Sequence, residues 1–240
     1  MSAIVVNQNW LNQNKNEKER PSCLNRLVEY SGSTAGSIRY LSVLRNALKL
    51  SGVAQPIADA AGTAISTIGL VRWPAAMKDA YTAVSNLTSA QGPVEVRAGV
   101  AVREVMEAVA SCCKASTFIK ANPVLQNVSQ WADLAGDGAD LGLSIDGYKR
   151  SSARENRTVG EVKEAYSHSR KYYMLRIAKA VLSFASAFFA ALMIVTGMRI
   201  LPVVLAILMS LAATLAAIRR DLYREEGKYK FIDVHNLAFA

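Results

Sequence analysis

Two long uncharged stretches dominate the hydrophobic pattern in the last third of the chain. Residues 180–198 and 200–218 each form a run of 19 positions without a charged side chain, and Arg199 separates them. A helix of that length rises about 28 Å, close to the hydrocarbon thickness of a bilayer. Gly197 and Pro202 suit a tight reversal between the runs. The pattern predicts an antiparallel transmembrane hairpin. The alternative is a buried hairpin in a soluble bundle, whose helices usually carry charge on one face.

The rest of the chain shows helical periodicity and no series of strands. Apolar residues recur every three or four positions between residues 37 and 50, with basic residues on the other side. Pro74 suits the first turn of a new helix. The expected class is all-α. The predicted helices are 37–50, 54–70, 74–87, 94–120 and 124–148, followed by a charged link at 149–157.

The helix predicted over 94–120 has one apolar stripe, which we expect to face a core. Arg103 and Glu107 lie four residues apart on its polar side and are predicted to pair. Cys112 belongs to the stripe and is predicted to be a small buried side chain. The stripe comprises Ala98, Val102, Val105, Val109, Cys112, Ser116 and Ile119.

Positive charge gathers around the two uncharged runs. The net charge of +9 divides into +3 over residues 1–150 (15 basic, 12 acidic) and +6 over residues 151–240 (13 basic, 7 acidic). Basic residues flank both runs on their outer sides, whereas the loop holds only Arg199. This asymmetry predicts that both termini lie on the cytosolic side. The residues predicted to contact the membrane surface are Arg39, Arg45, Lys49, Arg176, Lys179, Arg219 and Arg220.

Small residues repeat every four positions along both runs. Such spacing lets two membrane helices approach closely. The predicted packing residues are Ser183, Ala187 and Ala191 in the first run and Ala206 and Ser210 in the second.

The changes in composition divide the chain into four parts. Residues 1–23 are polar, lack the apolar core of a secretory signal, and are predicted to be a disordered tail. Residues 24–157 form a helical body that faces the cytosol. Residues 158–230 hold the membrane hairpin, and residues 231–240 are a short tail.

Recognisable catalytic and cofactor-binding motifs are missing from the sequence. The two histidines, His168 and His235, lie in polar surroundings, and no nucleotide-binding, zinc or nucleophile motif occurs. The acidic residues between Asp133 and Asp146 lack the order of a calcium loop. We therefore expect no enzyme activity, no cofactor and no metal. The basic residues do not form a nucleic-acid stripe, so the expected partners are a lipid bilayer and other proteins.

The polar N-terminal part followed by the runs 180–198 and 200–218 resembles the bilobed hydrophobic domain of chlamydial inclusion membrane proteins. The alanine- and serine-rich segment 37–152 is also similar to the bodies of some of those proteins. The resemblance implies export by a type III apparatus, insertion into the vacuole membrane and a body facing host cytosol. It also implies a scaffold role, in which the body binds host proteins. Other copies of the chain are a second kind of protein partner that we expect.

A second likeness leaves an alternative function open. Residues 24–50 have the rhythm of a short helix, a joint and a basic amphipathic helix, similar to the peroxins that elongate peroxisomal membranes. That likeness implies that the helix at 37–50 remodels membranes. The residues themselves leave two alternatives for this helix. It is either a bundle helix whose basic face is solvated, or an interfacial helix that lies on anionic lipid.

Overall fold

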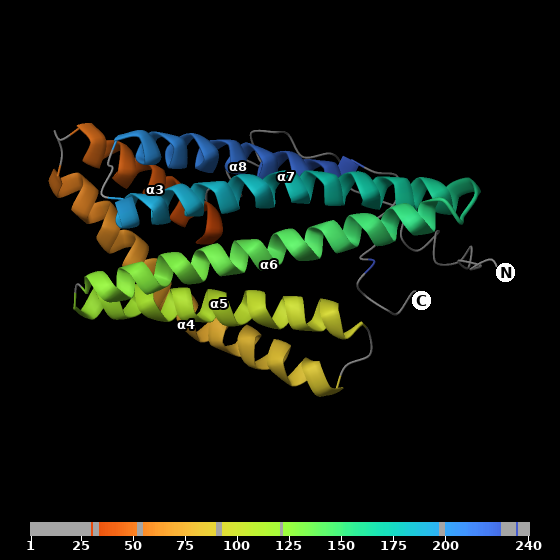
Figure 1. Ribbon diagram of the computed structural model, residues 1–240, viewed down its shortest axis with the longest axis horizontal. Coiled ribbons are helices and arrows are strands. Elements are labelled where there is room, and N and C mark those ends of the chain that lie inside the picture. The colour runs from red at the N-terminus through yellow and green to blue at the C-terminus, as the bar shows by residue number, and fades with distance from the viewer. Residues whose placement is uncertain are drawn as a thin grey trace.

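The computed structural model describes residues 30, 34–51, 55–89, 93–120, 122–196, 200–226 and 234. These residues form helices and no strand (Figure 1), so the all-α prediction is confirmed. The predicted N-terminal tail, the tip of the predicted hairpin and the C-terminal tail other than Val234 lie outside the described residues. The helices are α3 (Thr34–Ser51), α4 (Gln55–Ser89), α5 (Val94–Ile119), α6 (Pro123–Glu155), α7 (Gly160–Thr196) and α8 (Ile200–Glu226).

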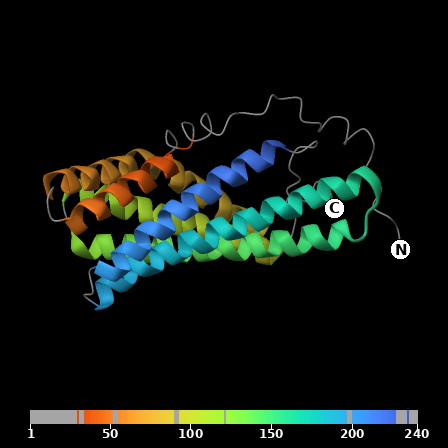
Figure 2. The same ribbon diagram turned by 90° about the horizontal axis from the view of Figure 1, so that it is seen from above.

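The helices close into a ring of neighbours. Each helix from α4 to α7 packs against the next one along the chain, and α3 packs against both α4 and α8. The helix that begins the body therefore touches the helix that ends the predicted hairpin. Helices α6 and α7 extend together past the other helices (Figure 2), and the turn at 156–159 joins them.

Local sequence explains how α6 begins and how α7 begins. The Asn122 side chain accepts a hydrogen bond from the Val124 amide at 2.9 Å, and Pro123 occupies the first helical position. Gly160 opens α7 with a φ of +64°, a conformation that costs a residue with a Cβ far more than it costs glycine.

Two predicted helix boundaries are wrong. Pro74 lies inside α4, which runs unbroken from Gln55 to Ser89. Packing of Ala76 and Ala80 on Ala108 of α5 holds the helix together despite the missing backbone donor.

The predicted link at 149–157 is helical as far as Glu155. The Arg150 Nε atom donates to the Asp146 carboxylate, one turn earlier, at 2.5 Å. Arg170 of α7 lies 3.1 Å from the Glu155 carboxylate. Arg150 and Glu155 are therefore paired, one along α6 and the other with α7, which favours the helix here.

Helix α5 packs on the bundle with a side that differs from the predicted stripe, although Val105 of the stripe packs on a buried cluster with α4. Ala98, Val102, Cys112 and Ile119 of the predicted core stripe are exposed, and the prediction that Cys112 is buried is wrong. Arg103 and Glu107 do not pair with each other: Arg103 pairs with Glu104 and Asp140, and Glu107 pairs with Arg72. The residues that α5 buries are mainly small: Val96, Ala101, Ala108, Ala110, Ser111, Cys113 and Ala115.

One end of the α6–α7 pair has a tyrosine core. Tyr166 and Tyr173 are among the largest fully buried side chains, and Tyr172 meets Tyr173 edge-on with ring centroids 5.8 Å apart. Gly147 of α6 admits the Tyr173 ring, because a Cβ at this glycine would lie 2.2 Å from Tyr173 Cε1. This position therefore requires glycine for the two helices to approach.

Candidate functional site

One described helix is long and apolar enough to cross a membrane. The segment Val203–Arg224 of α8 has a mean hydropathy of 1.8 in its most apolar window. The sequence predicts two such helices, but side chains at 190 and 193–198 of the predicted first span lie outside the described residues. The described residues thus support the second span.

Large apolar side chains line the outer faces of α7 and α8. Leu208, near the middle of α8, is 54% exposed. The exposed positions are spaced by three or four residues, so each helix shows one continuous apolar face. They are Val181, Phe184 and Phe188 on α7, and Leu201, Val204, Leu208, Leu211 and Leu215 on α8.

The inner faces of α7 and α8 are built from small residues. Ser183, Ala191 and Ala206 are buried, whereas Ala187 and Ser210 are half-buried. The Ser186 hydroxyl donates to the Ala206 carbonyl at 3.0 Å and links the two helices. The predicted packing residues thus lie at or near the side of the pair that faces the bundle.

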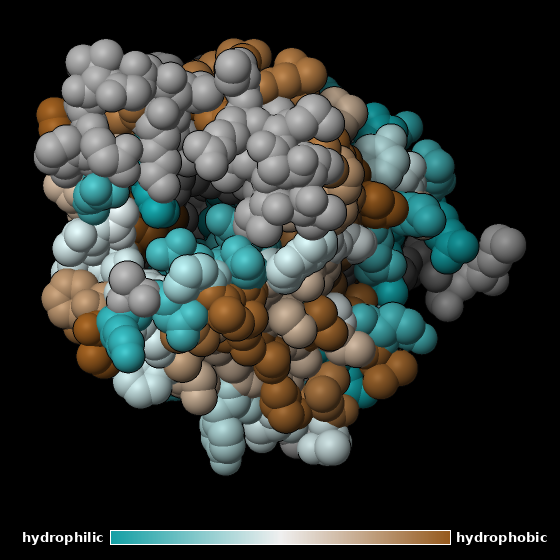
Figure 3. All heavy atoms as spheres, turned by 60° about the vertical axis from the view of Figure 1, so that its left-hand side comes forward, coloured by the Kyte–Doolittle hydropathy of each residue, from teal (hydrophilic) through white to brown (hydrophobic). Residues whose placement is uncertain are grey.

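Helix α4 carries the longest exposed apolar stripe of the body. Leu70, Trp73, Met77, Tyr81 and Val84 are all exposed and follow one another at helical spacing. Figure 3 shows brown hydrophobic side chains on the surface among teal hydrophilic ones. A small-residue core leaves large apolar residues exposed on the surface of the described helices.

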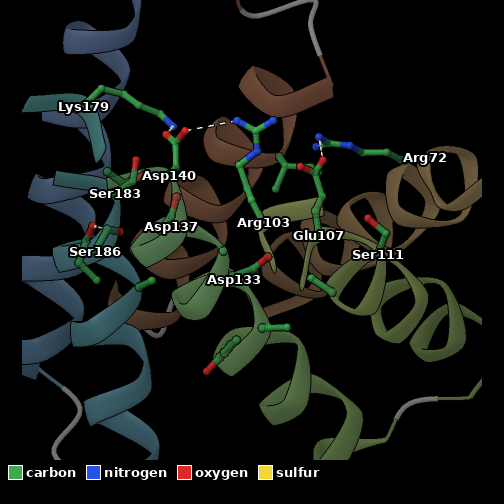
Figure 4. A pocket seen from close by; sticks show the side chains of 18 of the residues that line it. Arg72, Arg103, Glu107, Ser111, Asp133, Asp137, Asp140, Lys179, Ser183 and Ser186 are labelled. Carbon is green, nitrogen blue, oxygen red and sulfur yellow. Dashed lines mark hydrogen bonds and ion pairs between the residues drawn. The ribbon is translucent and has the colours of Figure 1, made fainter. Parts of the chain in front are cut away.

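A cavity of about 580 Å³ lies between the helices, and all six helices contribute to its lining. Figure 4 shows that its walls are charged: Asp140, Arg103 and Lys179 converge on one side, while Arg72 and Glu107 meet on another. Ser183 and Ser186 of α7 add hydroxyl groups to the wall. The interior of the bundle is therefore polar and has room for water or a small ligand.

Asp140 is the centre of this charge network. Its carboxylate lies 2.7 Å from Arg176, 3.2 Å from Lys179 and 3.6 Å from Arg103. Burial alone would raise the pKa of the Asp140 carboxyl, but the charges of Lys179, Arg176 and Arg103 outweigh burial and hold that pKa well below its ordinary value. Asp140 is thus ionised and joins α5, α6 and α7.

Two further ion pairs cross the cavity wall. Lys114 of α5 donates to Asp133 of α6 at 2.9 Å, and Arg72 of α4 pairs with Glu107 of α5. Burial lowers the pKa of the Arg72 guanidinium, and nearby carboxylates, Asp133 first, oppose that effect. These pairs hold neighbouring helices in register.

The residues predicted to contact the membrane surface fall in different environments. Arg176 and Lys179 turn inward to Asp140, and Arg45 of α3 lines the same cavity. Arg220 pairs with Asp221, whereas Arg219 is exposed and its guanidinium lies 5.8 Å from the centre of the Tyr223 ring. The side chains of Arg39 and Lys49 lie outside the described residues.

The sequence reasoning missed the charge network as a site. Asp133, Asp137 and Asp140 recur at helical spacing and therefore share one face of α6. Their partners Lys114, Arg176 and Lys179 lie 19 to 39 positions away. Helical periodicity does not predict which residues of different helices come into contact, so these pairs could not be predicted. No group of His, Cys, Asp and Glu side chains within the described ranges has a metal-holding arrangement.

Comparison with known proteins finds no relative: no family model, curated protein or solved structure matches the chain.

Proposed function

We propose that this chain is a membrane-anchored interaction protein without enzymatic activity. In this proposal α7 and α8 form the anchor, crossing the bilayer and returning so that both termini stay on the cytosolic side. Helices α3 to α6 form the body that binds partners. The likeness to chlamydial inclusion membrane proteins extends the proposal to a vacuole membrane with the body in host cytosol.

The observation that carries the anchor is the split between the faces of α7 and α8. Large apolar side chains such as Phe188 and Leu208 are exposed, whereas small residues such as Ala191 and Ala206 are buried. In water this arrangement leaves the largest apolar side chains exposed, so the fold loses the stabilisation that their burial would give. In a bilayer the same groups face hydrocarbon, and the small residues let the helices pack.

The α4 stripe supports the interaction role and fits a second copy of the chain. Its exposed positions, Leu70, Trp73, Met77, Tyr81 and Val84, are spaced 3, 4, 4 and 3 residues apart. That order reads the same in both directions from Met77. Two α4 helices crossing antiparallel about a twofold axis at Met77 would therefore match apolar position to apolar position.

Alkaline carbonate extraction of membranes tests the anchor. We expect the wild-type chain to stay in the membrane pellet. Leu208→Arg places a charge near the middle of the α8 apolar face, which costs about 3 kcal/mol of insertion, so a large fraction should move to the supernatant.

Tyr81→Arg is the matched control, because Tyr81 is 77% exposed and lies on the body. This variant should stay in the pellet like the wild type. Release of the wild-type chain by carbonate would refute the anchor.

A further inference from the structure

Positive charge is in excess in the wall of the central cavity. The described lining holds eight Lys or Arg side chains and five Asp or Glu side chains. Charges in a recess with low-dielectric walls are screened less than charges on an open surface. The cavity therefore attracts an anion, and the surplus is large enough for a multiply charged one.

The surplus is greatest around Asp140. One carboxylate faces Arg103, Arg176 and Lys179, and Arg103 is shared with Glu104. Two guanidinium groups and an ammonium group offer more donors than the two carboxylates accept. Donors of this kind bind phosphate oxygens, with arginine doing so in a bidentate way.

Arg45 supplies an independent observation. Its Nε atom is buried and has no hydrogen-bond partner among the described residues. A Cβ added at Gly62 of α4 would lie 3.3 Å from this atom, so the guanidinium lies close to the α4 backbone. A buried guanidinium donor without an acceptor is unfavourable. Arg45 also lines the cavity, so an anion bound there could supply the acceptor.

The size of the cavity indicates more than an inorganic ion. About 580 Å³ lies within the usual range for small-molecule sites. The hydroxyl groups of Ser111, Ser183 and Ser210 also line the wall and suit the polar remainder of an organic phosphate.

We propose that this cavity binds a phosphate monoester, with Arg45 as one of the residues that hold the phosphate group. The ester is either a soluble metabolite or the headgroup of an anionic lipid, since both present the same phosphate. Six lining residues, among them Ser183 and Ser210, belong to the predicted spans 180–198 and 200–218, so the cavity borders the proposed anchor. Phosphate binding by the detergent-solubilised protein and carbonate extraction of membranes test the site and the anchor separately.

Calorimetric titration of the full-length protein in neutral detergent tests the site. One arm adds glycerol 3-phosphate, and the other adds micelles containing phosphatidic acid, with phosphatidylcholine micelles as the blank. Heat with glycerol 3-phosphate identifies a soluble ester, and heat with phosphatidic acid alone identifies a lipid headgroup. No saturable heat in either arm overturns the proposal.

Arg45→Gln removes one proposed phosphate ligand, and no ion pair is assigned to Arg45 within the described residues. We expect this variant to bind about tenfold more weakly, as for the loss of one charge-assisted hydrogen bond. Arg219→Gln is the matched control, because Arg219 is exposed and outside the cavity lining, and its affinity should not change. Equal affinities of the two variants would overturn the assignment. Sulfate should compete with the ester for the site, so an unchanged wild-type affinity after chloride is replaced by sulfate would also overturn it.

Discussion

At the scale of single residues, Asp140 carries the largest electrostatic role. Asp140→Asn would remove the carboxylate that Arg103, Arg176 and Lys179 share, and Arg103 would keep its pair with Glu104. We expect a loss of about 3 kcal/mol in the free energy of unfolding, as for breaking a buried ion pair. Asp146→Asn is the control, because its pair with Arg150 is about one-third exposed and should contribute under about 1 kcal/mol. Thermal unfolding in detergent compares the two, and equal losses would contradict this role.

The same carboxylate predicts how stability depends on pH. Its pKa is lower in the folded protein than the ordinary value near 4 that it regains on unfolding. Its contribution is therefore complete above about pH 5 and is lost as pH falls towards the folded pKa. The melting temperature of the wild type should drop between about pH 5 and pH 2 by more than that of Asp140→Asn. Parallel pH profiles would contradict the prediction.

Two glycines of α6 give a paired prediction. A Cβ at Gly147 would lie 2.2 Å from Tyr173 Cε1, whereas a Cβ at Gly142 would meet nothing within 4 Å. Gly147→Ala should destabilise the fold by about 1–3 kcal/mol through overpacking. Gly142→Ala should stabilise it by up to about 1 kcal/mol, because alanine favours helix. Urea unfolding monitored by helical circular dichroism measures both, and changes of the same sign would be inconsistent with the close α6–α7 contact.

At the scale of elements, α4 contains a proline in its interior and another in its first turn. Pro74→Ala restores a backbone donor for the Leu70 carbonyl and should raise stability by about 1–3 kcal/mol. Pro56→Ala should change stability little, because Pro56 lies in the first turn, where an amide has no partner. Melting temperatures give the comparison. A loss of stability in Pro74→Ala would show that α3 and α5, which pack against α4, fit a bend that the proline creates.

Helix positions could largely be predicted from sequence, whereas the orientation of the helices could not. Apolar periodicity located α3 and α5 to within a few residues. The same periodicity in α5 separates Val102 and Cys112 from Arg103 and Glu107, but it does not say which side meets other helices. Because charged partners from α4, α6 and α7 line a cavity, the polar side of α5 faces inward, and that choice depends on contacts distant in sequence.

At the scale of the whole molecule, the exposed α4 stripe predicts self-association. Light scattering of the detergent-solubilised protein should give twice the 26.0 kDa chain mass after subtraction of the detergent. Tyr81→Glu places charges at two symmetry-related positions of the proposed interface and should give a monomer. Val102→Glu, at an exposed position on α5, should remain dimeric. A monomeric wild type would refute the α4 interface.

Helix α7 is long and unbroken, so a tilt at one end displaces the other end. Its 37 residues extend about 55 Å, nearly twice the thickness of a bilayer's hydrocarbon core. If α7 crosses the bilayer as proposed, a change of about 10° in its tilt would move the far end by roughly 5 Å. Helix α6 would move with it, because Asp140 and Tyr173 join the two helices. Bilayer thickness would thus be converted into displacement at the turn 156–159, well away from the lipid.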